Sequence, residues 1–223
     1  MVVLDEVFEK IAEDKERAFV MTNSCTPEKI LTWNDVEQYL NDNIHNSDIT
    51  TIGEDYQKKN TYKSTETSST PTSTIFSEIN SGYSFVLSYM ERYTKGLYYA
   101  SNIFSLIQNK YVTTNIYGGI SNTSKSFRTH ADPQSVLILQ LDGESEWTIF
   151  GEKWNGNPNE VVCMNDSILT VDFQYTLQPG DVLYIPYKRY HKCIPRSKRL
   201  SASVSADYKS ERPSNYGDWC KFN

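Results

Sequence analysis

Histidine is scarce in this chain, with three copies among 223 residues. The four cysteines, Cys25, Cys163, Cys193 and Cys220, include no Cys-x-x-Cys pair, which argues against a zinc site or a disulfide framework. We interpret them as free thiols of a reducing compartment. No segment approaches the run of about 18 apolar residues that a membrane-spanning helix requires. The sequence therefore predicts no membrane partner.

Basic residues are outnumbered by acidic ones, which gives a formal net charge of −6 and a pI near 5.2. A chain with this balance is not expected to bind a nucleic acid across its surface. The first sixteen residues are acidic where a signal peptide carries basic residues and a long apolar stretch. We therefore expect a cytoplasmic protein without a nucleic-acid partner, either a monomer or a homodimer.

The part of the chain before residue 110 combines periodic apolar residues with one stretch rich in Ser and Thr. Helices are expected at residues 4–16 and 33–41, the second opened by a capping box at residues 32–35, with a short strand at 18–21. Residues 54–75 are expected to form a mobile insertion, because they bury too little apolar surface to offset their ordering entropy. Apolar stripes predict further helix across residues 82–109.

From Lys110 onward, β-branched and aromatic residues dominate and turn residues interrupt them. Strands are expected at 111–117, 126–131, 135–141, 145–150, 159–164, 168–175, 182–186, 190–194 and 199–207. Many short strands separated by turns are typical of a β-sandwich or barrel. The predicted fold class is therefore mainly β.

Two of the three histidines lie near a carboxylate in the stretch 127–208. His130 and Asp132 are two residues apart, so on a strand both side chains point to one face. His191 follows a turn signal at residues 178–181 and an apolar run. Two histidines and one carboxylate on one face of a metal ion leave the opposite face open, as in the facial triad of non-haem Fe(II) oxygenases. We predict that His130, Asp132 and His191 bind one metal ion.

The motifs around these residues resemble the JmjC and cupin-like branch of the Fe(II)/2-oxoglutarate-dependent oxygenases. The resemblance covers residues 111–208 and, more loosely, 19–40. It rests on Asn115-Ile116-Tyr117, His130-Ala131-Asp132, Gln140-Leu141-Asp142-Gly143, Trp147 and the segment from Leu177 to His191. Within the branch, the chain looks most similar to the ribosomal oxygenases and the asparaginyl hydroxylases.

The resemblance implies a double-stranded β-helix (jelly-roll or cupin) core at residues 111–208, with N-terminal helices of residues 1–110 packed outside it and a C-terminal tail at 209–223. It implies Fe(II) as cofactor and 2-oxoglutarate as cosubstrate, with succinate and CO2 as co-products of C–H hydroxylation. The substrate is then a protein or peptide side chain or a small molecule. No catalytic residue beyond the metal ligands is expected. Asp132 favours hydroxylation, because a small residue replaces this carboxylate in the related halogenases.

One position departs from the family pattern. In this branch, a Lys or Arg two residues after the glycine of Gln-x-x-Gly grips the far carboxylate of 2-oxoglutarate, and here Ser145 occupies that position. A buried carboxylate needs a compensating charge or several hydrogen-bond donors. Other 2-oxoglutarate oxygenases supply an Arg from the last barrel strand with a hydroxyl two residues on, and Arg199 and Ser201 fit that arrangement.

Other residues are candidates for the same pocket. Lys198, Arg128 and Lys188 are rivals for the anchor, and the resemblance implies that Asn115 and Tyr117 line the cosubstrate pocket. Two alternatives to the oxygenase stay open. One is a catalytically silent cupin that binds a partner or ligand, motivated by Ser145. The other is a metal cupin with another cosubstrate or chemistry, such as a thiol dioxygenase.

Overall fold

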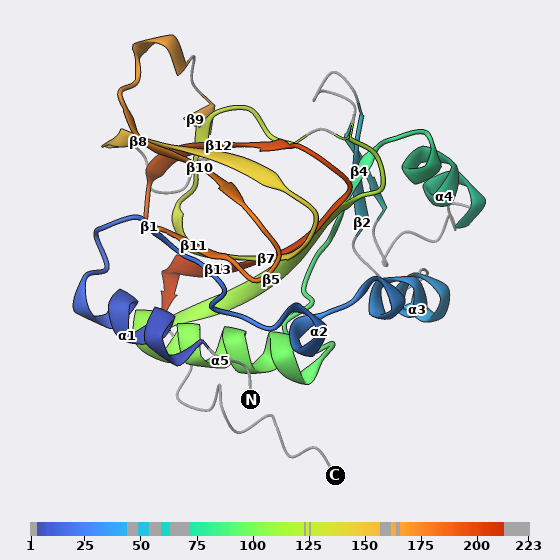
Figure 1. The fold of residues 1–223 in the computed structure, drawn as a ribbon, viewed down its shortest axis with the longest axis horizontal. Coiled ribbons are helices and arrows are strands. Elements are labelled where there is room, and N and C mark those ends of the chain that lie inside the picture. Colours follow the sequence, from blue (N-terminus) through green and yellow to red (C-terminus); the bar gives the residue numbers. More distant parts are fainter. Residues whose placement is uncertain are drawn as a thin grey trace.

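Two antiparallel β-sheets packed face to face form the centre of the molecule, and the helices lie outside them (Figure 1). The computed structural model describes residues 4–43, 49–53, 59–62, 72–122, 124, 126–156, 162–163 and 166–211. The architecture is the mainly β, double-stranded β-helix that the sequence predicts.

The larger sheet is made of β1 (Phe19–Met21), β2 (Ile49–Ile52), β3 (Lys59–Tyr62), β4 (Ser84–Leu87), β5 (Lys110–Gly119), β7 (Gln134–Asp142), β11 (Val182–Ile185) and β13 (Arg199–Glu211). Its strand order is β1-β11-β7-β13-β5-β4-β2-β3. The smaller sheet is made of β6 (His130–Ala131), β8 (Ser145–Lys153), β9 (Val162–Cys163), β10 (Val171–Leu177) and β12 (Arg189–Pro195). Its order is β10-β8-β12-β6-β9, so the strands predicted beyond residue 110 are present, although β6 and β9 are short.

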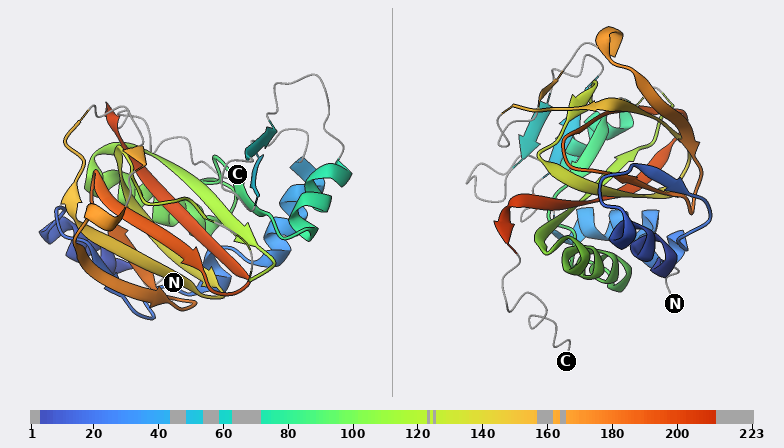
Figure 2. Two further views of the ribbon diagram at one scale, coloured as in Figure 1. Left: turned by 90° about the horizontal axis from the view of Figure 1, so that it is seen from above. Right: turned by 90° about the vertical axis from the view of Figure 1, so that its left-hand side faces the viewer.

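Five α-helices and one 3-10 helix complete the described chain. They are α1 (Asp5–Glu13), α2 (Pro27–Ile30), α3 (Trp33–Asn43), α4 (Thr72–Asn80), α5 (Lys95–Gln108) and η1 (Asp166–Ile168). Helix α5 packs on the outer face of β5 and β13, with α1 and α2 beside it (Figures 1 and 2). The predicted capping box is present at α3, where Asp35 accepts from the backbone N–H of Thr32 at 2.7 Å and Thr32 accepts from the N–H of Asp35 at 3.3 Å.

The central strands β7 and β13 of the larger sheet are buried on both faces, and their side chains therefore alternate between two environments. Leu137, Leu139 and Leu141 of β7 pack toward the helices, whereas Val136 and Ile138 point between the sheets. Strand β13 follows the same rule with a different composition. Its apolar residues Leu200, Ala202, Val204 and Ala206 face the helices, and the intervening Ser201, Ser203 and Ser205 are buried on the opposite face. The inner face of β13 is thus small and hydroxylated.

The helix predicted from residue 82 is wrong over its first part. Ser84–Leu87 forms β4, which pairs with β2 on one side and β5 on the other. Tyr89, which the helical stripe placed inside, is 64% exposed and has a left-handed backbone with φ of 63°. The spacing of the apolar residues is compatible with a helix and with a strand. A strand forms because pairing with β2 and β5 satisfies the backbone hydrogen bonds on both sides of Phe85.

The Ser/Thr-rich stretch is also more ordered at its borders than predicted. Residues 59–62 pair with β2 as β3, and α4 begins at Thr72, whereas residues 54–58 and 63–71 lie outside the described residues. Strands β1 to β4 lie in the same sheet as the barrel strands. The predicted domain boundary at residue 110 stays a prediction. In the part of the chain that the structure describes, no helix is both long and apolar enough to cross a membrane.

Candidate active site

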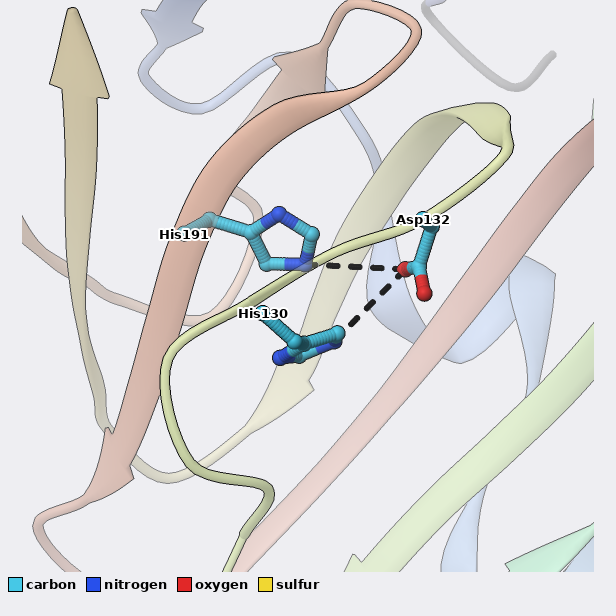
Figure 3. A group of neighbouring side chains, drawn as sticks. All are labelled: His130, Asp132 and His191. Carbon is cyan, nitrogen blue, oxygen red and sulfur yellow. Dashed lines mark ion pairs between the residues drawn. The ribbon is translucent and has the colours of Figure 1, made fainter. Parts of the chain in front are cut away.

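The side chains of His130, Asp132 and His191 point toward one another (Figure 3). The Nε2 atom of each histidine lies 3.6 Å from Oδ2 of Asp132, and the two imidazole centroids are 4.3 Å apart. Potential ligand atoms of all three side chains lie within 4.8 Å of one another. The structure therefore brings together the three residues that the sequence selects.

The backbone fixes the orientation of both imidazoles. Nδ1 of His130 donates to the carbonyl of Arg128 at 2.6 Å, and Nδ1 of His191 donates to the carbonyl of Arg189 at 2.9 Å. A neutral imidazole that donates through Nδ1 presents the lone pair of Nε2. Each Nε2 atom therefore faces the cluster as an acceptor, as a metal ligand requires.

Asp132 lies outside the strands, and a backbone hydrogen bond links it to the turn before β12. The strand predicted at 126–131 is reduced to the two residues of β6, and Asp132 follows directly after it. The Asp132 carbonyl accepts from the backbone N–H of Lys188 at 3.1 Å, in the turn that precedes β12. This bond ties the segment of His130 and Asp132 to the strand that carries His191.

Charge and burial set the protonation of the cluster. Burial and, to a smaller extent, the charge of His130 lower the pKa of His191 to about 4, against the opposing effects of Asp132 and of the bond to the Arg189 backbone. Burial by itself raises the pKa of Asp132, but the neighbouring side chains of His130 and His191 bring it below its usual value. A neutral imidazole and an ionised carboxylate are the forms that coordinate a divalent metal. The donor set therefore fits a ferrous ion.

A pocket of about 430 Å3, including the space at its mouth, contains the three side chains. The lining residues come from both sheets and from the segment before β6: Tyr117, Ser126, Phe127, His130, Asp132, Val136, Ile138, Trp147, His191, Cys193, Arg199, Ser201 and Ser203.

Arg199 is a buried cation in this pocket, with 2% of its surface exposed. Among the described residues, its guanidinium makes one hydrogen bond, from Nη1 to Sγ of Cys193 at 3.1 Å. Its Nε and Nη2 atoms are buried without a partner. A buried charge with open donors is costly unless an anion meets it. Ser201 lines the same pocket two residues further along β13.

The rival cations do not line the pocket. Lys198 lies over the ring of Trp33 and 3.7 Å from Asp142, and Lys188 donates to the carbonyl of Gly156. Arg128 is exposed, and its carbonyl supports His130. Tyr117 lines the pocket, and burial raises its pKa to about 12.

Asn115 is not among the residues that line the pocket, and it contributes a hydrogen bond to Tyr117 instead. Ser145, at the position where relatives carry a cation, is buried at the start of β8 beside Cys193.

Sequence reasoning did not select Cys193, Ser203 and Ser126 for the site. The alternation of side chains along a strand could have identified two of them as pocket residues, because Cys193 follows His191 by two residues and Ser203 follows Ser201 by two. Burial raises the pKa of the Cys193 thiol, although the charge of Arg199 and the neighbouring Ser126 and Ser145 oppose this shift. Ser126 precedes β6 in a segment without regular structure, so no period pointed to it.

The fold and the cluster together define a double-stranded β-helix of the metal-oxygenase type. The JmjC domain family matches residues 97–213, more than half of the chain, and the chain belongs to this family.

Curated relatives match a shorter part. Ribosomal oxygenase 2 of Bos taurus is 30% identical over 90 residues, which is 40% of this chain and 19% of the relative. The bifunctional lysine-specific demethylase and histidyl-hydroxylase NO66 of Drosophila willistoni is 30% identical over 101 residues, 42% of this chain and 13% of the relative. The chain thus spans about a fifth or less of these relatives' length.

Solved structures extend the likeness of the fold to nearly the whole chain. The ribosomal oxygenase YcfD of Escherichia coli, in complex with cobalt and 2-oxoglutarate, superposes with a TM-score of 0.63 at 14% identity, over 96% of this chain and 53% of that one. An X-ray structure of the same protein gives a TM-score of 0.64. At this identity, the likeness establishes the shared fold.

Proposed function

We propose that this chain is an Fe(II)- and 2-oxoglutarate-dependent oxygenase that hydroxylates a C–H bond. His130, Asp132 and His191 would hold Fe(II), and Arg199 with Ser201 would bind the far carboxylate of 2-oxoglutarate. The bound metal and cosubstrate would supply the oxidising chemistry, in which O2 and 2-oxoglutarate give succinate, CO2 and one hydroxyl group on the substrate.

One observation carries the proposal: the cluster of ligand atoms and the buried, unneutralised guanidinium of Arg199 occupy the same pocket. A metal site alone is compatible with many cupin chemistries. A buried cation that lacks an acidic partner among the described residues requires an anion from outside. The far carboxylate of a dicarboxylate cosubstrate bound at the metal would supply this anion to Arg199.

The residues of the chain have distinct parts in this scheme. The backbone acceptors of Arg128 and Arg189 hold both imidazoles with Nε2 toward the metal. Arg199 offers a planar fork that matches two carboxylate oxygens. Trp147, Val136 and Ile138 line the pocket with apolar surface, which excludes water and strengthens the charge contacts inside.

A protein or peptide side chain is the substrate class we propose. The support is the naming of the relatives, which are called ribosomal oxygenases and a histidyl-hydroxylase. A small-molecule substrate is the alternative within the same activity.

Anaerobic titration tests the proposal directly. The protein is loaded with Fe(II) and titrated with 2-oxoglutarate, and succinate is then measured after air is admitted without a substrate. Saturable binding of 2-oxoglutarate together with slow succinate formation is expected. Binding without succinate under any condition would favour a silent cupin, and metal binding without any 2-oxoglutarate binding would favour a cupin with a different cosubstrate.

A further inference from the structure

Cys193 makes the contact that orients the guanidinium of Arg199, and it belongs to the opposite sheet. Cys193 lies on β12 of the smaller sheet, opposite Trp147, while Arg199 opens β13 of the larger sheet, opposite Gly119. The Nη1–Sγ hydrogen bond of 3.1 Å therefore crosses the interior of the barrel. Both side chains are buried, with 6% and 2% exposed.

The direction of this bond determines which part of the guanidinium stays available. Nη1 is occupied by the sulfur, and the two nitrogens without a partner among the described residues are Nε and Nη2. These two atoms lie on the same edge of the planar group and carry parallel N–H bonds. A carboxylate accepts two parallel N–H bonds from such an edge.

A thiol at residue 193 can orient the guanidinium of Arg199 and still leave it able to bind an anion, because sulfur is a weak hydrogen-bond acceptor. A carboxylate at residue 193 would neutralise Arg199 and compete with an incoming anion. A purely apolar residue would leave Nη1 without its bond, and the long side chain of Arg199 would lose a constraint on its last torsions. The thiol fixes the group without satisfying its charge.

We infer that Cys193 is a positioning residue for the cosubstrate: through its bond to Nη1 it holds Arg199 with the Nε–Nη2 edge turned toward the far carboxylate of 2-oxoglutarate. This inference rests on the proposed function. It links the strand of the metal ligand His191 to the anchor, because Cys193 is two residues from His191 and both line the pocket.

Three variants of residue 193 test the inference by anaerobic binding to the Mn(II)-loaded protein. Cys193→Ser keeps a small acceptor, Cys193→Ala removes it, and Cys193→Val fills similar space without it. Cys193→Ala and Cys193→Val are expected to weaken 2-oxoglutarate binding by about tenfold or more, the effect of one lost hydrogen bond to a charged group. Cys193→Ser is expected to stay within about threefold of the parent.

Two further measurements separate positioning from packing. 2-Oxopentanoate, which carries a methyl group in place of the far carboxylate, is expected to bind all four proteins with the same affinity. In an Arg199→Met background, Cys193→Ala is expected to have no further effect on 2-oxoglutarate binding, because the pair acts as a unit. The Mn(II) dissociation constant of each variant is measured separately and is expected to match the parent.

The outcomes are distinct. Unchanged 2-oxoglutarate binding in both Cys193→Ala and Cys193→Val overturns the inference and leaves the proposed function standing. A loss that is equal for 2-oxopentanoate, or that persists in the Arg199→Met background, assigns Cys193 a packing role and also overturns it. A parent protein that binds Mn(II) but no 2-oxoglutarate overturns the proposed function and the inference together.

Discussion

His130 and His191 are directly opposed residues on neighbouring antiparallel strands, β6 and β12, and each donates its Nδ1 hydrogen to the carbonyl two residues before it. The repeated local bond gives both rings the same tautomer. Strand pairing then brings the rings to a centroid distance of 4.3 Å. Two short-range bonds and one long-range pairing thus turn the Nε2 atoms of both rings toward Asp132.

The first prediction concerns these ligands. His130→Ala or His191→Ala should weaken Mn(II) binding by about a hundredfold or more, because loss of residues that merely support ligands already costs 10–100-fold. Succinate formation should be lost in parallel. Isothermal titration with Mn(II) measures the effect, and His45→Ala, which changes the third histidine of the chain, is the matched control. Full metal affinity in either test variant would refute the assignment.

The second prediction concerns the anchor. Arg199→Ala should raise the 2-oxoglutarate dissociation constant by about a hundredfold or more, since losing one partner of a buried charge pair costs about 3–5 kcal/mol. Arg199→Lys should restore part of the loss, because a point charge replaces the fork. Lys198→Ala, a change in the preceding residue outside the pocket, should bind as the parent does. If the loss appears in Lys198→Ala instead, the anchor is Lys198.

The third prediction follows from the cost of burying Arg199 without an anion. Arg199→Met fills similar space without a charge and should stabilise the ligand-free protein by about 1 kcal/mol or more. The same variant should lose the stabilisation that 2-oxoglutarate gives to the metal-loaded parent. Urea unfolding with and without 2-oxoglutarate measures both effects. A ligand-free Arg199→Met protein that is less stable than the parent would show that the guanidinium is already satisfied.

The fourth prediction couples a turn to the anchor strand. Gly143 has φ of +64°, and a Cβ atom there would lie 1.6 Å from the backbone oxygen of Lys198. Gly143→Ala should cost about 2 kcal/mol or more, from backbone strain and from displacement of the segment before Arg199. It should also weaken 2-oxoglutarate binding. The control is Gly151→Ala in β8, where the nearest atom to the new Cβ is 3.8 Å away. Equal stability of the two variants would contradict the prediction.

The fifth prediction tests the capping box of α3. Asp35→Ala removes the acceptor for both the backbone N–H and the hydroxyl of Thr32, each at 2.7 Å. The cost should be about 1 kcal/mol. Glu37→Ala, an exposed change on the same helix, should remain within about 0.5 kcal/mol of the parent. Thermal unfolding of the three proteins measures these differences in stability. The substitution Asp35→Ala should leave the affinity for 2-oxoglutarate unchanged.

The sequence by itself determined the features that depend on a fixed local period or a local bond. The two-residue spacing of Arg199 and Ser201 put both side chains on one face of β13, and the capping box at Thr32 and Asp35 set the start of α3. The alternation of Leu200 to Ala206 likewise specified which face of β13 is apolar. These relations involve neighbours in the chain, whose relative directions are dictated by strand or helix geometry.

Tertiary structure decided the features that depend on partners distant in sequence. Phe85 and Val86 lie in a strand because β2 and β5 flank them, although their spacing also fits a helix. Arg199, rather than Lys198, faces the pocket because pairing with β5 and β7 sets the register of β13. The contact of Arg199 with Cys193 depends on how the two sheets face each other, and no local period encodes that distance.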